Sequence, residues 1–555
     1  MKRELEVAVA ACVKELFDVD MPVELTRPEE QFGDYATNIA LRLSKHAGKP
    51  PREIAEALAE KFRAQLAEQV SEVAVAGPGF INLKLSDAAL ARALAMEPAM
   101  SLQGKTVVAE YSDPNPFKVL HAGHLYTSVV GDAIANLLEQ AGAAVHRVNF
   151  GGDVGLHVGK TMWAILQELD GEQPDKLAQI PEAERSDWMA QAYVKGTQAY
   201  DDDEQAKADI IALNKRVYQL HDQNDHDSPF AQIYWTCRQW SYDYFDAFYA
   251  RIGTKFEKYY PESETAPLGL RTVREHIGDV YQQSDGAVIF DGEKYGLHTR
   301  VFINSEGLPT YEAKDIGLII KKWQDYHFDT SVIITGNDII EYMKVVLKSV
   351  EQFQPELPAR SRHLTHGIVK LAGGTKMSSR KGNFLRAVDV LDAANEANRA
   401  LTGQAATEET SLGAVKYAFL KNRMGGDIIY DPEESVSLEG NSGPYLQYAH
   451  ARARSILRKV DVSDENIVDF EPGERSLARK IAEYPEVIDK AVAGLMPHHV
   501  CTYLYELAQT FNRFYENNRV IGDPRQAARL ALVGRYADTL KQGLALLGIA
   551  SPEKM

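Results

Sequence analysis

A strand, a polar loop, a helix and a second strand follow one another between residues 104 and 150, and this unit strongly restricts the fold. The stretch Lys105–Tyr111 is mostly apolar and β-branched, with Pro114 soon after it. Apolar residues recur at helical spacing from His124 until Gly142, and Ala143–Phe150 reads as another strand. The unit predicts a parallel α/β sheet of the Rossmann type, which binds ligands at the carboxyl ends of its strands.

The loop between the first strand and the helix carries the candidate chemistry. It reads Asn-Pro-Phe-Lys-Val-Leu-His-Ala-Gly-His over residues 115–124. We predict that His121 and His124 donate hydrogen bonds to the phosphates of a nucleotide and to the charge that develops at its α-phosphorus. Gly123 leaves room for a base or ribose, and Lys118 supplies a fixed positive charge. An isolated His-x-Gly-His could also be a surface pair that caps a helix, so the loop alone leaves its role open.

A second, cationic element follows about 250 residues later, as Lys-Met-Ser-Ser-Arg-Lys-Gly over residues 376–382. We expect its cations and hydroxyls to reach the β- and γ-phosphates from the opposite side. Such charge runs are more often solvated loops. The two elements in this order are typical of class I aminoacyl-tRNA synthetases, which activate a carboxylate with ATP.

Three further regions make the chain resemble the bacterial-type arginyl-tRNA synthetases from end to end. Residues 30–38 with 76–82 are similar to that family's N-terminal additional domain, 310–317 to its amino-acid pocket, and 546–555 to its closing stretch. The resemblance implies ATP, as its Mg²⁺ complex, L-arginine and tRNA(Arg) as partners. It implies catalytic roles for Lys118, His121, His124, Lys376, Ser378, Arg380 and Lys381, and ATP contacts from His121, Gly123, His124, His366, Gly367, Val369 and Met377.

An arginine side chain needs a planar pocket that is rich in acceptors. Tyr311 and Asp315 are four residues apart, so on a helix they share a face, and Glu262 could add a second carboxylate. By resemblance these three match guanidinium-pocket positions and Asn115 matches one near the α-amino group. Asn337, at the end of another predicted strand, faces the same site. Such a pocket needs no editing site, because analogues would leave its buried acceptors unpaired.

The chain departs from the class pattern at Ser379, where a second lysine is usual; in the family, Lys118 is thought to compensate. Three alternatives stay open. The chain could be another kind of nucleotidyltransferase, a non-catalytic synthetase-like RNA-binding paralogue, or a class I synthetase for cysteine or another small amino acid. The segment Gly155–Thr161 resembles a phosphate loop but has three residues between its glycines where four are needed.

The composition agrees with a large enzyme of the cytoplasm. The chain has 555 residues and a net charge of −18, so RNA would have to bind local basic patches. We predict such contacts from Tyr448, Arg454, Arg458 and Arg513. Three scattered cysteines and the lack of a long apolar segment predict no disulfide framework, no structural metal and no membrane contact. We also expect a monomer.

The domain organisation follows from these patterns. We expect a small α/β tRNA-binding domain at 1–85, a linker at 86–104, and a catalytic domain at 105–390 with a helical insertion near 160–250. A connector at 391–411 and an α-helical anticodon-binding domain at 412–555 complete the chain.

Overall fold

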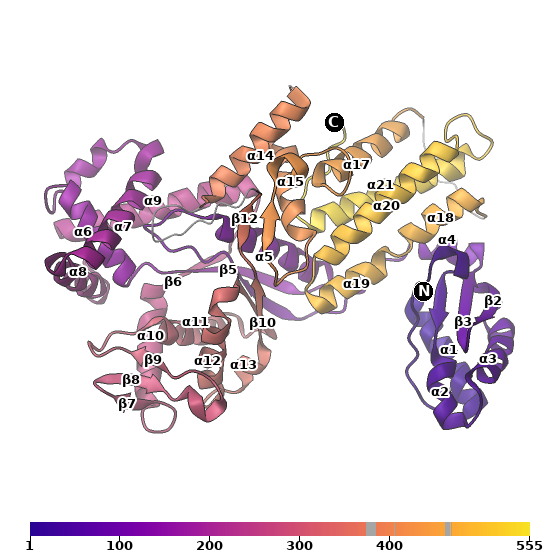
Figure 1. Cartoon of the computed structure of the whole chain (residues 1–555), viewed down its shortest axis with the longest axis horizontal. Helices are drawn as coiled ribbons and strands as arrows, with labels where there is room; N and C mark the ends of the chain where they lie inside the picture. The colour runs from indigo at the N-terminus through magenta and orange to yellow at the C-terminus, as the bar shows by residue number, and fades with distance from the viewer. Residues whose placement is uncertain (373–384, 404–405, 461–466, 468) are drawn as a thin grey trace.

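A small N-terminal domain and a helical insertion lie at opposite ends of the molecule, with a parallel sheet between them (Figure 1). The computed structural model describes residues 1–372, 385–403, 406–460, 467 and 469–555. Among the described residues, none of the helices has the length and apolarity that crossing a bilayer requires.

The N-terminal domain packs helices on an antiparallel sheet of order β1-β3-β2. Ile54, Leu58 and Phe62 recur at helical spacing along one side of α3 and are fully buried against the sheet. The elements are α1 (Lys2–Phe17), η1 (Glu30–Phe32), β1 (Tyr35–Thr37), α2 (Ile39–Ala47), α3 (Pro51–Gln65), β2 (Val70–Ala76) and β3 (Phe80–Leu85), followed by α4 (Asp87–Ala93).

The central sheet has the order β11-β10-β4-β5-β6, and its strands are parallel. It comprises β4 (Thr106–Glu110), β5 (Ala144–Gly151), β6 (Lys258–Pro261), β10 (Thr330–Gly336) and β11 (Ser361–His366). Helix α5 (Ala122–Gln140) joins β4 to β5, which confirms the predicted strand–helix–strand unit. The chain extends from β4 to β5 and β6 on one side, and returns through β10 and β11 on the other. The crevice at the carboxyl ends of β4 and β10 is therefore the place where a ligand is expected.

The insertion after β5 is helical, as predicted, and surrounds a core of its own. It contains α6 (Leu156–Glu168), η2 (Pro174–Gln179), η3 (Glu182–Glu184), α7 (Arg185–Asp202), α8 (Glu204–Asp222) and α9 (Pro229–Ile252). The lower part of the catalytic region in Figure 1 holds α10 (Glu262–Glu275), β7 (Gln282–Ser284), β8 (Ala287–Phe290), η4 (Gly292–Tyr295), β9 (Arg300–Ile303), α11 (Tyr311–Tyr326), η5 (Asn337–Ile339), α12 (Ile340–Glu351) and α13 (Glu356–Arg360).

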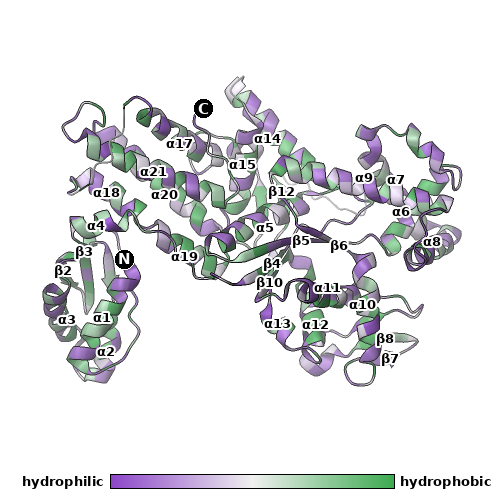
Figure 2. Cartoon of the chain, turned by 180° about the vertical axis from the view of Figure 1, so that it is seen from behind, coloured by the Kyte–Doolittle hydropathy of each residue, from purple (hydrophilic) through white to green (hydrophobic). Residues whose placement is uncertain are grey.

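The C-terminal part is mostly helical. Its elements are α14 (Ala387–Thr402), α15 (Glu408–Leu420), α16 (Pro432–Ser435), α17 (Gly443–Leu457), α18 (Pro472–Ile481), α19 (Tyr484–Gly494), α20 (His498–Asn517) and α21 (Gln526–Leu546). Hydrophobic and hydrophilic patches alternate along α20 and α21 (Figure 2), as expected for helices that bury one face. One element differs from the expected helical pattern: β13 (Ile428–Tyr430) is a strand and pairs in parallel with β12 (Val369–Leu371). The predicted fold class is confirmed.

Ion pairs hold the N-terminal domain against α18 and α19. Asp34, only 2% exposed, lies 2.7 Å from an Arg475 nitrogen and 3.3 Å from Arg479 Nε. The Arg27 guanidinium lies 2.6 Å from Glu486. This contact joins residues that are more than 400 positions apart in sequence.

Candidate active site

The two signature histidines cap helix α5 reciprocally. His121 is the N-cap residue, and its Nδ1 accepts a hydrogen bond from the Gly123 N–H at 3.1 Å. The Nδ1 of His124 accepts from the backbone N–H of His121, also at 3.1 Å, and the ring centroids are 3.8 Å apart. Because both Nδ1 atoms accept, each imidazole carries its proton on Nε2. A Cβ at position 123 would lie 2.8 Å from the His121 ring, so a larger residue there would displace this imidazole.

Both imidazoles are neutral near pH 7. Burial, with a smaller contribution from the Lys118 charge, lowers the pKa of His121 to about 4. Burial, followed by the effect of His121, holds the pKa of His124 well below its ordinary value. Two neutral N–H donors at the N-terminus of a 19-residue helix suit a phosphate group, which the helix dipole also attracts.

The described residues that come after the second signature lie beside these histidines. The Ala122 N–H donates to the Leu385 carbonyl at 2.8 Å, and the Ala387 N–H donates to the Leu120 carbonyl at 2.9 Å. The start of α5 is therefore bonded to residues that come three to five positions after the cationic segment. The segment itself lies outside the described residues, so the roles of Lys376, Met377, Ser378, Arg380 and Lys381 stay predictions.

A buried ion pair lies next to the histidine loop. Glu262 begins α10 at the end of β6, and its Oε2 is 2.6 Å from Lys314 Nζ in the first turn of α11. The two side chains are 3% and 4% exposed. A Cβ at Gly152 would lie 3.1 Å from Glu262 Oε1 and 2.7 Å from Asn115 Oδ1. Glycine at position 152 therefore lets the Asn115 amide and the second Glu262 oxygen approach the same place.

Burial and the attraction between the two charges act in opposite directions on this pair. Burial alone would lower the pKa of Lys314, but the opposing charge of Glu262 raises it above its ordinary value. Burial raises the pKa of Glu262, and the Lys314 ammonium opposes that rise. A pair at 2.6 Å in a buried site is more stable as two ions than with either one neutralised in isolation.

Asp315 follows Lys314 on α11 and is a second buried acid. Its Oδ2 accepts a hydrogen bond from the Tyr342 hydroxyl of α12. Burial raises the pKa of Asp315 to about 8, and the nearby charges of Glu110 and Glu262 add to the rise. The structure thus brings the two predicted carboxylates, Glu262 and Asp315, near each other, and we call them the acid pair.

Tyr311 and Asn337 differ in their relation to these acids. Tyr311 begins α11 with half of its side chain exposed, and its ring centre lies 5.0 Å from Lys314 Nζ. Asn337 is exposed at the start of η5, and its amide donates to the Gly425 carbonyl at 2.8 Å. Tyr311 can therefore cover the acid pair, whereas Asn337 lies on the side of the site where β10 ends.

The charge of Lys118 affects the pKa of His121, His124 and Glu262, so this lysine lies near all three side chains. Its Nζ is 4.5 Å from the ring centre of Tyr193 in α7.

The insertion also holds the residue before this lysine. Phe117 has a left-handed backbone (φ 67°), its N–H donates to Ser241 Oγ of α9 at 2.9 Å, and its ring is buried against Tyr234 at 5.5 Å between centroids. The insertion thus fixes one edge of the site.

The predicted nucleotide residues of β11 and β12 pack beside α5. His366 is 4% exposed, its Nδ1 donates to the Gly367 carbonyl, and its Nε2 lies 2.6 Å from the Thr127 hydroxyl. A Cβ at Gly367 would lie 2.3 Å from the Gly426 carbonyl oxygen. Val369, the first residue of β12, is half-buried. These residues connect α5 to the strand that leads to the cationic segment.

Two helices carry the acid pair, and glycines let them cross closely. A Cβ at Gly269 of α10 would lie 1.7 Å from the Ala313 carbonyl oxygen, and one at Gly317 of α11 would lie 2.1 Å from the Thr265 carbonyl oxygen. Backbone approaches backbone here, so glycine is required on both helices. The crossing sets the separation of Glu262 from the residues of α11.

The predicted RNA-contacting residues belong to the C-terminal part: Tyr448 and Arg454 on α17, Arg458 at its C-cap and Arg513 on α20. Arg454 Nε is 2.9 Å from Glu553, and Arg458 donates to the Glu553 carbonyl at 2.8 Å. Tyr448 is 44% exposed, and Arg513 is exposed and bonded to Thr510 at 3.1 Å. Arg454 and Arg458 therefore both bind Glu553 in this structure.

Sequence reasoning did not select Lys314, Gly152, Gly269 or Gly317. The position of Lys314, three residues after Tyr311, already placed it near the same helical face. The glycines give no local signal, because each is needed for a neighbour distant in sequence. The rejected phosphate-loop segment is the first part of α6, with Gly155 as its N-cap.

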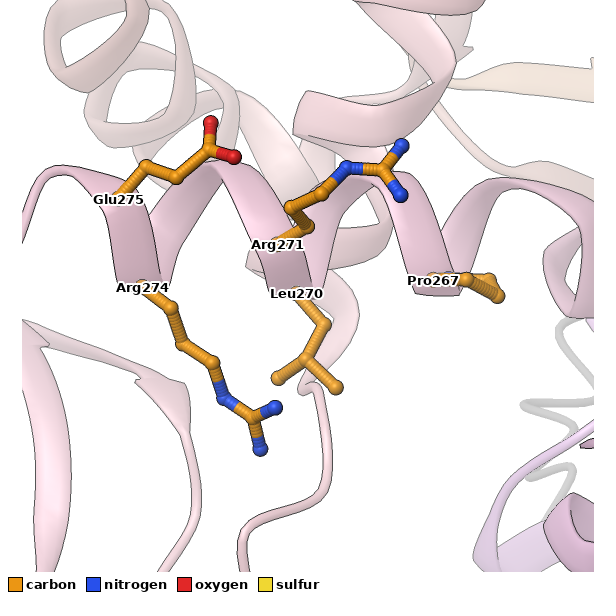
Figure 3. Close-up of a pocket in the computed structure, with 5 residues that line it drawn as sticks. All are labelled: Pro267, Leu270, Arg271, Arg274 and Glu275. Carbon is orange, nitrogen blue, oxygen red and sulfur yellow. The ribbon is translucent and has the colours of Figure 1, made fainter.

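A surface depression of about 480 Å³ lies along α10, away from this site. It is lined by Pro267, Leu270, Arg271, Arg274 and Glu275 (Figure 3). It contains none of the predicted site residues. Within the described part of the chain, no group of three or more His, Cys, Asp or Glu residues has the geometry of a metal site.

Comparisons with known proteins cover the whole chain. The model described as "Arginyl tRNA synthetase N terminal domain" matches residues 1–85, "tRNA synthetases class I (R), catalytic domain" matches 87–431, and "DALR anticodon binding domain" matches 446–555. The arginine–tRNA ligase of Synechococcus elongatus is 31% identical over 600 residues, which cover 100% of this chain and 99% of the relative. That of Porphyromonas gingivalis is 28% identical, with the same coverage.

Solved structures agree with these matches. Thermus thermophilus arginyl-tRNA synthetase superposes with a TM-score of 0.82 at 27% identity and covers 100% of both chains. Arginyl-tRNA synthetase from Plasmodium falciparum has a TM-score of 0.81 at 22% identity, with 100% of this chain and 99% of that one covered, and so shares the fold.

Proposed function

The chain belongs to the class I arginyl-tRNA synthetase family, and from this premise we propose how its own residues join arginine to tRNA. Proteins of this family are arginine–tRNA ligases, and ATP is the substrate that activates the amino acid. The observation that carries the residue assignment is the grouping of Glu262 and Asp315 beside Asn115, next to the two neutral histidines.

The first step forms arginyl-adenylate. The arginine carboxylate attacks the α-phosphorus of Mg-ATP, the bond to the β-phosphate oxygen breaks, and pyrophosphate leaves. The Nε2–H groups of His121 and His124 donate to the phosphates as negative charge moves onto them. Lys118 adds a fixed charge, and the cationic segment containing Lys376, Ser378, Arg380 and Lys381 completes the phosphate contacts. The protein supplies alignment and electrostatics and no covalent nucleophile.

Arginine is held by its two ends. The guanidinium donates to the free oxygens of Glu262 and Asp315, with Tyr311 as a partial cover, and the Asn115 amide lies where the α-amino group enters. Gly123, His366, Gly367, Val369 and Met377 contact the nucleotide, and Asn337 faces the site from the end of β10.

The second step transfers arginine to RNA. A ribose hydroxyl of the terminal adenosine attacks the activated carbonyl, and AMP leaves. We assign residues 1–85 and 412–555 to tRNA binding, with Tyr448, Arg454, Arg458 and Arg513 in the second region, and residues 105–390 to catalysis. Bound tRNA is required for the first step, and the enzyme acts as a monomer in the cytoplasm.

Exchange of pyrophosphate into ATP tests this proposal, with each of the twenty amino acids in turn and with or without tRNA. We expect exchange with arginine alone, and only when tRNA is present. Exchange driven by lysine or cysteine and not by arginine would refute it.

A further inference from the structure

The acid pocket already contains a cation that belongs to the protein. Lys314 Nζ takes one oxygen of Glu262 at 2.6 Å and contacts the Val154 carbonyl at 3.4 Å. The rings of Tyr311 and Tyr218 lie 5.0 and 5.8 Å from the same nitrogen. Aromatic faces stabilise a desolvated ammonium, and the Lys314 side chain is only 4% exposed, so this charge is held in a buried site.

The position of Lys314 limits how a substrate can use Glu262. Oε2 is occupied, and Oε1 lies on the side of Gly152 and Asn115. A substrate cation that binds Oε1 at hydrogen-bond distance then lies roughly 5–6 Å from Lys314 Nζ. In a buried site of low dielectric, two positive charges at that separation repel each other strongly.

This repulsion acts unequally on arginine and on amino acids that end in an ammonium group. A guanidinium spreads its charge over a plane and can donate to Oε1 and to Asp315 at once. An ammonium concentrates its charge on one strongly hydrated nitrogen, and it would have to lose its water next to a second ammonium. A fixed like charge is a known way to reject a competing ligand.

Building on the proposed arginine site, we propose that Lys314 is a specificity-determining residue, whose buried ammonium excludes lysine and ornithine from the Glu262 subsite. It also keeps Glu262 ionised and oriented for the guanidinium. The selectivity of the pocket thus comes from a repulsive cation as well as from two attractive acids.

The test measures kcat/KM in tRNA-dependent pyrophosphate exchange with arginine, lysine and ornithine for the full-length protein. In Lys314→Met we expect the preference for arginine over lysine to fall by about tenfold or more. Lys314→Gln keeps a hydrogen-bond donor to Glu262 without the charge, so it should show the same loss and serves if the methionine variant does not fold. Lys314→Arg should keep most of the preference. Lys321→Met removes a half-buried lysine charge of α11 that pairs with Asp325 and not with Glu262, and serves as a matched control.

The outcomes are separable. If Lys314→Gln lowers kcat/KM for arginine and lysine by the same factor, the residue is structural and the inference is wrong. If Lys321→Met narrows the preference as much as Lys314→Met, the effect is a general loss of charge and the inference is again wrong. If the wild-type protein shows no arginine-dependent exchange, the proposed function itself is wrong, whatever the variants show.

Discussion

Asp315 is mostly protonated at neutral pH in the protein without substrate, because burial raises its pKa to about 8. The groups that face it are Tyr342, Glu110, Glu262 and Lys322, of which the two glutamates add to the rise. A guanidinium binds the ionised carboxylate better than the neutral acid. Arginine binding therefore has to release a proton from Asp315.

This linkage predicts how the affinity for arginine depends on pH. Below the pKa of Asp315, each unit of pH should change the KM for arginine by up to about tenfold, with KM falling as pH rises from 6 to 8. His121, with a pKa lowered to about 4, is already neutral in this range and contributes no slope. Steady-state exchange at several pH values gives the measurement.

Asp315→Asn serves as the control, because it should raise the KM for arginine and remove its pH dependence. If the wild-type protein has the same KM for arginine at pH 6 and at pH 8, the assignment of Asp315 to the arginine site is wrong.

At the scale of elements, the crossing of α10 and α11 determines whether Glu262 and Lys314 meet. We predict that Gly317→Ala raises the KM for arginine more than it lowers kcat, because its Cβ would meet the Thr265 carbonyl oxygen at 2.1 Å and push the helices apart. The cost in the free energy of unfolding should be about 1–3 kcal/mol. Thermal unfolding and exchange kinetics report the two effects.

The matched control is Gly534→Ala in α21, where an added Cβ meets nothing within 4 Å. It should stabilise the helix slightly, by about 0.5–1 kcal/mol, and leave the KM unchanged. Equal kinetics for both variants would show that the crossing does not set the pocket.

The insertion provides a second test at this scale. Ser241→Ala removes the acceptor for the Phe117 N–H, which holds that residue in its left-handed conformation. We predict that kcat for exchange falls by about tenfold, since the neighbouring Lys118 loses its position. Thr502→Ala is the control, because the Thr502 hydroxyl donates to the carbonyl four residues earlier, as that of Ser241 also does. If kcat is unchanged in Ser241→Ala, the contact between the insertion and Phe117 does not contribute to catalysis.

These elements also show which parts of the fold and the site can be predicted from the sequence. The strand–loop–helix unit at 105–150 is predictable because apolar spacing and flanking glycine and proline act over short distances. The strand β13 is not, since its partner β12 is 59 residues away and its surroundings are helical. The pairing of Lys314 with Glu262 depends on two glycines that face each other across a helix crossing, which local periodicity cannot reveal. Nor could the motif of Arg454 and Arg458 show that Glu553 contacts both.

At the scale of the whole molecule, the N-terminal domain is attached to the C-terminal helices through buried ions. We predict that Asp34→Asn loosens this attachment, because Arg475 and Arg479 lose a shared carboxylate. Removing one partner of a buried pair costs up to about 3–5 kcal/mol. The radius of gyration should increase in small-angle scattering and the KM for tRNA should rise, while the KM for arginine stays the same.

Glu53→Gln breaks an exposed i,i+4 pair in the same domain and should change neither quantity. An Asp34→Asn protein with wild-type scattering and tRNA kinetics would show that other contacts suffice to hold the domain.

The ionic attachment of the N-terminal domain also limits how this protein could be recombined. A hybrid that receives the first 85 residues from a distant homologue would bring two guanidinium groups of α18 against a foreign surface. Unless the transplanted piece carries an acid where Asp34 stands, Arg475 would keep only Asp87 and Arg479 only Glu483 as an acidic partner among the residues that the structure describes. A hybrid with a distant homologue should therefore be most stable when the N-terminal domain and helix α18 are exchanged together.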